Sequence, residues 1–221
     1  MSSDWSSDVC SSDLFAQLQK ANAYHEAGPQ MYRMDIPPEA HYNNWIADRT
    51  IDFLNNIGDE DFYLFCSFPD PHHPFAACKP YSEMYNPDDL PLTATWENHE
   101  DACDFLRQQR AAAPQQNVQS EEELREAMAQ TYGMITHIDN NVGRVMEALK
   151  ANGLDDNTVV AFLADHGEYL GSHHLMRKAP WPWEELWRVP FIWRVPGGQQ
   201  QSHAVDQPVS SLDLVATIVD Y

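Results

Sequence analysis

The feature that most constrains the fold is a long amphipathic stripe followed at once by a short apolar run. Between residues 124 and 149, apolar side chains recur at alternating steps of four and three, the spacing of one buried helix face. Ser120 and Glu123 precede the stripe in the order of a capping box, and Gly153 follows it as a helix stop. Residues 158–164 are almost entirely apolar, which is typical of a buried strand.

The flanking segments favour an α/β architecture. Helical spacing covers residues 39–57, and the aromatic-rich run 62–68 is interpreted as a fully buried strand. A further strand is predicted at residues 191–195, and a last helix begins near residue 211. Because strands that alternate with helices form parallel sheets, we predict a central, mostly parallel sheet flanked by helices.

The charge of the chain narrows the classes of partner. Its 221 residues carry a formal net charge of -21 at pH 7. This charge argues against binding the phosphate backbone of nucleic acids and against attraction to anionic membranes. No apolar run approaches the roughly 20 residues of a membrane-spanning helix. We therefore expect neither a nucleic-acid partner nor membrane insertion.

A potential metal-binding pair stands at the end of the predicted strand 158–164. Asp165 and His166 follow this strand directly, and Gly167 permits a tight exit from it. In open α/β sheets, ligands bind beyond the carboxyl ends of the strands. A carboxylate and an imidazole at this place can face one metal ion. The alternative is an ordinary turn from strand to loop.

The surroundings of this pair carry several motifs in a fixed order. Residues 165–175 read Asp-His-Gly-Glu-Tyr-Leu-Gly-Ser-His-His-Leu, and Lys178 follows them. These motifs resemble the sulfatase family of the alkaline phosphatase superfamily, whose pattern is D-H-G-E-x-L-G-x-H followed by a lysine. The resemblance covers most of residues 39–221 and implies an alkaline-phosphatase-like α/β fold with an incomplete sheet. Further segments similar to the family are residues 67–75, 137–144, 153–158, 188–197 and 210–214.

The resemblance implies a divalent-metal site at Asp165 and His166. The expected metal is calcium, with magnesium or manganese as alternatives. Calcium prefers oxygen ligands, whereas imidazole suits transition metals, so a contact of His166 with substrate stays open. Two protein groups and water are expected to hold a hard cation weakly.

The resemblance also implies residues that contact the substrate. Lys178 is expected to hold the sulfate as a point charge. His72, in the Pro-rich loop 69–91, is expected to contact the sulfate or the leaving oxygen, where an imidazole can transfer a proton. The P-H-x-P register of the family selects His72 rather than His73. His174 is assigned to substrate binding, with surface exposure as its alternative. The alternatives without a role in binding substrate are hydrogen bonding within the loop for the histidines and a solvated surface position for Lys178.

The cysteines mark where the chain departs from the family. Cys10, Cys66, Cys78 and Cys103 show neither C-x-x-C spacing nor a zinc-ligand pattern, so we expect free, partly buried thiols. None stands in C-x-P-S-R or C-x-A-x-R, the motifs whose cysteine becomes the formylglycine nucleophile. We expect that nucleophile, with the paired aspartates of the family, upstream of residue 39 in the parent protein.

The N-terminus is interpreted as foreign to the fold. Residues 1–14 repeat Ser-Ser-Asp three times, a period too short to build a packing unit. The segment resembles translated sequencing-adapter strings, so we interpret it as a non-native extension. Residues 15–221 then form a partial sulfatase catalytic domain.

Together these observations predict a sulfuric ester hydrolase. The parent protein is expected to hydrolyse a small-molecule or carbohydrate sulfate ester with the help of a metal. The chain alone is expected to show negligible activity and to expose apolar sheet edges that favour aggregation. One alternative is a phosphonate monoester or phosphodiester hydrolase of the same superfamily, because sulfate and phosphate esters share tetrahedral geometry. The other is a non-catalytic pseudoenzyme or binding module.

Overall fold

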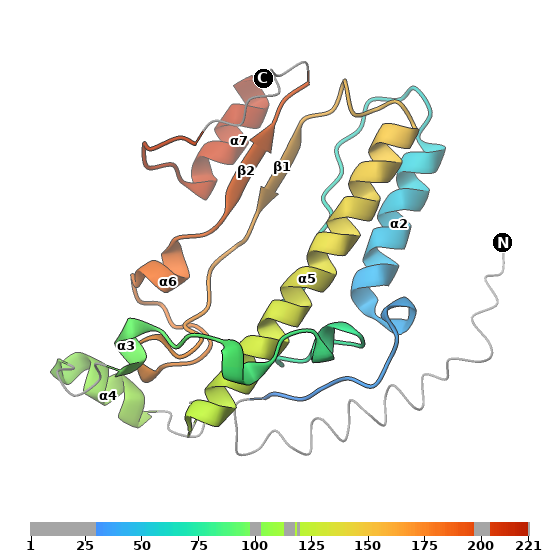
Figure 1. Ribbon diagram of the computed structural model, residues 1–221. Coiled ribbons are helices and arrows are strands. Elements are labelled where there is room, and N and C mark those ends of the chain that lie inside the picture. The colour runs from blue at the N-terminus through green and yellow to red at the C-terminus, as the bar shows by residue number, and fades with distance from the viewer. Residues whose placement is uncertain (1–29, 98–102, 113–117, 119, 197–203, 221) are drawn as a thin grey trace.

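The computed structural model describes residues 30–97, 103–112, 118, 120–196 and 204–220 (Figure 1). The interpretation of residues 1–14 as an extension therefore falls outside the described residues. The helices are α2 (Tyr42–Asn56), α3 (Ala94–Glu97), α4 (Asp104–Ala112), α5 (Glu121–Ala151), α6 (Glu184–Trp187) and α7 (Ser211–Asp220), and the strands are β1 (Val160–Leu163) and β2 (Phe191–Arg194). Short 3₁₀ turns lie at Pro38–Ala40, Tyr81–Glu83, Pro87–Asp89 and Ser172–His174.

Helix α5 confirms the strongest prediction from the sequence. The Ser120 hydroxyl accepts a hydrogen bond from the Glu123 amide at 3.1 Å, as an N-cap does. Gly153 follows the helix with φ +69°, a left-handed conformation that favours glycine. Within the expected stripe, Ile135 is 47% exposed while the adjacent Met134 is buried, and Val142 and Val145 are half-buried. No described helix, α5 included, combines the length and apolarity needed to cross a membrane.

Helices α2 and α5 lie side by side and run in the same direction (Figure 1). Polar contacts along α2 fix its register against the second half of α5. Near the start of α2 and just past the middle of α5, Asn44 Oδ1 accepts from the side chains of His137 and Asn141. Near their C-terminal ends, Asn152 donates to Asn55 Oδ1 at 2.8 Å.

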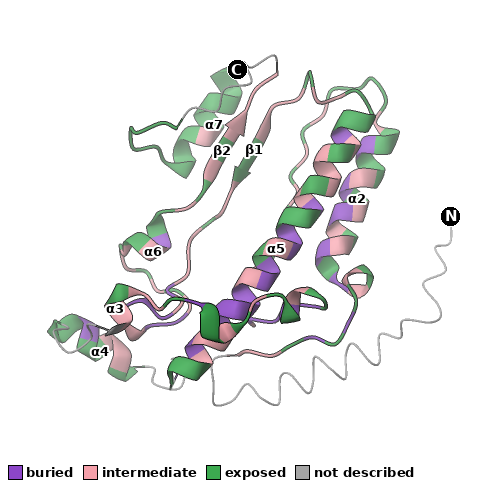
Figure 2. Ribbon diagram, in the orientation of Figure 1, coloured by how far each residue is buried: buried purple, intermediate pink, exposed green. Residues whose placement is uncertain are grey.

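The buried core lies around the first half of α5 (Figure 2). Phe75 and Leu124 are fully buried there, together with Ala127 and Met128. A second, smaller cluster joins α4 to the chain between β1 and β2 through Leu106, Tyr169, Leu175 and Leu186. This second cluster supports the loop that follows β1.

The sheet differs from the expected one. Strands β1 and β2 form a two-stranded antiparallel sheet in which Val160 pairs with Arg194 and Leu163 with Phe191. The strand predicted at residues 62–68 is not formed, because the described residues provide no neighbour for its backbone. Its side chains alternate between exposed and half-buried, and Tyr63 and Phe65 are 76% and 75% exposed rather than fully buried.

Candidate active site

The turn after β1 is pressed against the backbone of α6. The Gly167 amide donates to the Leu186 carbonyl at 2.8 Å. A Cβ atom on Gly167 would lie 1.8 Å from the Glu185 carbonyl oxygen, so a side chain at this position has no room. The Asp165 carboxylate accepts the His166 amide at 2.9 Å, which closes the turn on itself. These contacts fix the start of both side chains.

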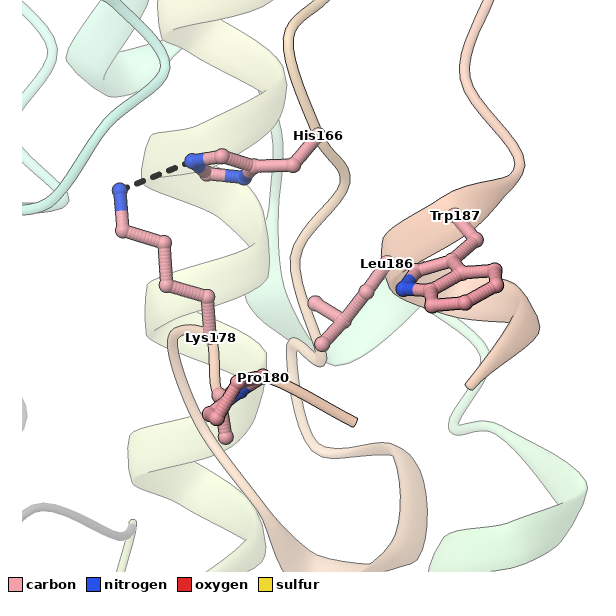
Figure 3. Close-up of a pocket in the computed structure, with 6 residues that line it drawn as sticks. His166, Lys178, Pro180, Leu186 and Trp187 are labelled. Carbon is pink, nitrogen blue, oxygen red and sulfur yellow. Dashed lines mark hydrogen bonds between the residues drawn. The ribbon is translucent and has the colours of Figure 1, made fainter. Parts of the chain in front are cut away.

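His166 and Lys178 meet beside this turn (Figure 3). The Lys178 Nζ lies 2.9 Å from His166 Nε2. The other ring nitrogen, Nδ1, lies 2.7 Å from the Gly167 carbonyl, which can only accept. The ring proton therefore stands on Nδ1, and Nε2 offers its lone pair to the ammonium. Asp165 Oδ2 lies 3.6 Å from His166 Nε2. The side chains of Asp165, His166 and Lys178 thus form one cluster of a carboxylate, an imidazole and an ammonium, which we call the polar corner.

This corner opens into a cavity of about 350 Å³. Its polar side consists of His166 and Lys178. Its apolar wall comes from the two residues directly after Lys178 and from α6 (Figure 3). Polar groups on one side of an apolar hollow are typical of sites for small organic ligands. The wall residues are Ala179, Pro180, Leu186 and Trp187.

Two charged residues behind this polar corner, Glu168 and Arg177, were not identified from the sequence as members of the site. Burial raises the pKa of the Glu168 carboxyl, while hydrogen bonds from the Leu170 and Arg177 amides and the positive charge of Lys178 oppose this shift. Burial also lowers the pKa of Arg177, and its Nε has no hydrogen-bond partner among the described residues. The available signals were the glutamate inside the D-H-G-E motif and a second cation directly before Lys178.

The loop histidines lie on the side of the two cations. His72 and His73 stack with ring centroids 4.0 Å apart, and His72 Nδ1 lies 2.5 Å from the His73 carbonyl. Burial, followed by the charges of His72, Arg177 and Lys178, lowers the pKa of His73 to about 4. His73 is therefore within electrostatic reach of Lys178. The role of His72 stays a prediction, with its ring placed beside that of His73.

His174 is not among the residues that line the cavity. Its ring stacks on Trp96 with centroids 3.9 Å apart, and its Nε2 lies 2.6 Å from the Trp96 carbonyl. The backbone explains this direction, since His174 stands in the 3₁₀ turn with φ +57°. The structure thus turns the predicted substrate-binding side chain towards α3 and away from the cavity.

Asp165 and His166 fit one side of a divalent-cation site. The Asp165 side chain is 87% exposed, so its oxygens remain available to a cation. His166 Nε2 already contacts a positive group, the ammonium of Lys178. Calcium takes about six to eight oxygen ligands, of which this carboxylate supplies at most two. The Asp165 carboxylate therefore fits calcium in kind and supplies part of its shell, whereas the His166 imidazole suits a transition metal better.

Comparison with known proteins gives concordant matches. A family model described as Sulfatase matches residues 3–221. The arylsulfatase of Clostridium perfringens is 34% identical over 187 residues, covering 82% of this chain and 38% of that protein. The multifunctional alkaline phosphatase superfamily protein PehA of Trinickia caryophylli is 30% identical over 200 residues, covering 84% of this chain and 39% of that protein. The chain thus spans about two fifths of the length of these relatives.

A solved structure agrees with these matches. The phosphonate monoester hydrolase SpPMH from Silicibacter pomeroyi aligns with a TM-score of 0.71 at 28% identity, covering 84% of this chain and 38% of that chain. This likeness confirms the predicted α/β fold class, of which the described residues form the helices and a small sheet. With a family model that extends over nearly all its residues, the chain belongs to the sulfatase family, within the alkaline phosphatase superfamily.

Proposed function

We propose that this chain provides part of the active site of a metal-dependent hydrolase of sulfate esters. The observation that carries the proposal is the contact of Lys178 Nζ with His166 Nε2 at 2.9 Å beside Asp165. The chain spans about two fifths of its relatives, so the proposal concerns the protein in which this part acts.

In this proposal Lys178 holds an anionic oxygen of the substrate. His166 Nε2 has a single lone pair, so it cannot serve Lys178 and a metal ion together. With a metal ligated by Asp165 and His166, the ammonium is free to turn to the sulfate. A bound divalent ion contributes Lewis acidity at the reacting group. The neighbouring Arg177 adds a second positive charge behind this position.

Proton transfer at the leaving oxygen is assigned to the loop histidines. Because its pKa lies near 4, His73 is neutral at pH 7 and is a poor general acid there. His72 stands beside it in the P-H-x-P register and is the better candidate. Calcium is the proposed metal, since the exposed Asp165 carboxylate is a hard oxygen ligand.

The cavity supports an ester with an organic leaving group. Its apolar wall, which includes Leu186 and Trp187, adjoins the polar pair and can contact the carbon skeleton of an aryl or sugar alcohol. A second candidate substrate is a phosphonate monoester. The aligned structure from Silicibacter pomeroyi favours it, because that protein is named for this activity and has a TM-score of 0.71.

The experiment compares two esters that share a leaving group. Hydrolysis of p-nitrophenyl sulfate and of p-nitrophenyl phenylphosphonate is measured with the full product of the gene that encodes this chain. The proposal expects kcat/KM for the sulfate to exceed that for the phosphonate. Lys178→Ala should lower it about 10²- to 10³-fold, as loss of one donor to a developing anion does. Lys150→Ala, on the exposed end of α5, is the matched control. Equal rates for both variants would refute the role of Lys178.

A further inference from the structure

A second group of potential metal ligands lies inside the molecule, away from the cavity. It joins the N-cap of α2, the loop before the turn at Tyr81–Glu83, and the middle of α5 through His41, Cys78 and His137. One ligand atom of each lies within 4.8 Å of the other two. The three residues are 2%, 0% and 1% exposed. Three segments far apart in sequence thus place a thiol and two imidazoles together in the core.

The spacing of Cys78 and His137 matches that of two ligands on one zinc ion. Cys78 Sγ lies 3.5 Å from His137 Nδ1. In a tetrahedral site with Zn–S of about 2.3 Å and Zn–N of about 2.0 Å, sulfur and nitrogen stand roughly 3.5 Å apart. The metal-free thiol can donate a hydrogen bond to Nδ1 across the same distance. The two atoms therefore already stand at the length of a coordination edge.

An outer contact sets the tautomer of His137. Its Nε2 lies 2.6 Å from Asn44 Oδ1, the amide oxygen that also accepts from Asn141. An amide oxygen can only accept, so His137 carries its proton on Nε2 and leaves Nδ1 bare towards Cys78. A ligating histidine that donates its other nitrogen to an oxygen is the usual arrangement around protein-bound metals.

His41 contributes an unpaired nitrogen. Its Nδ1 accepts the Asn43 amide at 3.2 Å as the cap of α2. Its Nε2 is buried and has no hydrogen-bond partner among the described residues. Because Nδ1 accepts, the neutral ring carries its proton on Nε2, and this buried N–H has no acceptor among the described residues. Coordination of a metal through Nε2 therefore moves the ring proton to Nδ1 and gives up the 3.2 Å cap bond from Asn43. Burial lowers the pKa of His41 to about 3 and of His137 to about 4, so both rings are neutral, as metal ligands are.

A buried carboxyl balances the charge that a metal would bring. Asp70 Oδ2 lies 4.0 Å from His41 Nε2 and accepts from Asn43 Nδ2 at 2.8 Å. Tyr42 donates to the other oxygen of Asp70. A zinc ion, the Cys78 thiolate and the Asp70 carboxylate sum to zero charge, which removes the main penalty of burying an ion.

We propose that His41, Cys78 and His137 bind a zinc-type transition-metal ion. Binding replaces the thiol proton of Cys78, which leaves to solvent, with a sulfur–metal bond. The ion then ties α2, the loop at Cys78 and α5 together. This site is independent of the proposed hydrolase function, because it lies in other segments and uses a soft sulfur ligand that calcium avoids.

The test uses cobalt as a spectroscopic substitute for zinc. The reduced, metal-stripped chain is titrated with Co²⁺, and the near-ultraviolet thiolate-to-cobalt band is recorded. The variant Cys10→Ser/Cys66→Ser/Cys103→Ser keeps Cys78 as the only cysteine, so the test does not require the buried residue to tolerate substitution. We expect one equivalent of Co²⁺, an undiminished band in this variant, and displacement by Zn²⁺ but not by Ca²⁺.

Three further variants separate coordination from a purely structural network. Cys78→Ser should abolish the band, and circular dichroism verifies that the variant is folded. Asn44→Ala should weaken Zn²⁺ binding about 10- to 100-fold, the usual effect of removing the outer partner of a ligating histidine. The single-cysteine variant decides the question: absence of the band there, with the chain folded, would overturn the proposal. His166→Ala should leave the band intact, and its loss would equally overturn it.

Discussion

The substitution Gly167→Ala tests how the turn after β1 is built. The added Cβ would lie 1.8 Å from the Glu185 carbonyl oxygen and 2.9 Å from the carbonyl carbon, whereas ordinary contacts begin at 3.4 Å. Relief requires the turn and α6 to separate, which breaks the 2.8 Å hydrogen bond from Gly167 to Leu186. Overpacking costs about 1–3 kcal/mol and a lost hydrogen bond about 0.5–1.5 kcal/mol. We expect a loss of about 2–4 kcal/mol of folding free energy.

The assay is urea unfolding followed by tryptophan fluorescence, with a thermal melt as a second readout. A loss of this size lowers Tm by roughly 5–15 °C for a chain of this length. Gly143→Ala is the matched control, because a Cβ on this exposed residue of α5 meets no atom within 4 Å. Alanine there should stabilise the helix by about 0.5–1 kcal/mol. If Gly167→Ala unfolds at the same urea concentration as the unmodified chain, the described packing of this turn is wrong.

Further predictions concern pH and turnover. Buried His41 and His137 have pKa values lowered to about 3 and 4 from 6.5, so the stability they contribute is complete above pH 6.5 and lost as the pH falls towards 3–4. Asp70 acts in the opposite direction, since its pKa is raised to about 6: its contribution is complete below about 3.8 and is lost as the pH rises through 6. Each unit of depression removes about 1.4 kcal/mol, so the metal-free chain should lose stability from pH 6.5 to 3.5 in urea titrations, and His137→Gln should reduce this loss. A free energy of unfolding that does not change between pH 6.5 and 3.5 would contradict the burial of His41 and His137. The 221-residue chain, which has no C-x-P-S-R or C-x-A-x-R motif, should hydrolyse p-nitrophenyl sulfate no faster than a heat-treated control, and turnover clearly above that control would refute this.

Local signals made the helices predictable. The cap at Ser120, the apolar stripe and the stop at Gly153 are all encoded within α5 or next to it, and the helix forms between them. Strands β1 and β2 were found for the same reason, because each is a short apolar run with clear ends. The one error within α5, at Ile135, arose because an ideal period cannot show which of two adjacent apolar residues faces the loop packed on it.

The features that the sequence did not predict depend on contacts between segments that lie far apart in the chain. A strand needs partners, and the aromatic run at 62–68 has none among the described residues, so its apolar pattern alone misled the prediction. His174 follows the same motif as Lys178, yet a left-handed backbone turns it onto Trp96. The group of His41, Cys78 and His137 has no sequence signature, since only the pairing of α2 with α5 brings its members together.

The contact between Lys178 and His166 was accessible only through the family motif. Composition and periodicity placed Asp165 and His166 at the end of a strand, but gave no reason to connect them with a lysine in the next loop. The fold supplies that reason, because the loop returns to the turn and places Lys178 Nζ on His166 Nε2.

The most direct test of the proposed site is a crystal structure of this chain grown with saturating calcium and sulfate. The account predicts calcium on the Asp165 carboxylate beside His166, with the Lys178 ammonium turned away from His166 Nε2 and bonded to a sulfate oxygen in the cavity. Calcium and sulfate bound elsewhere, with Lys178 still on His166, would contradict it.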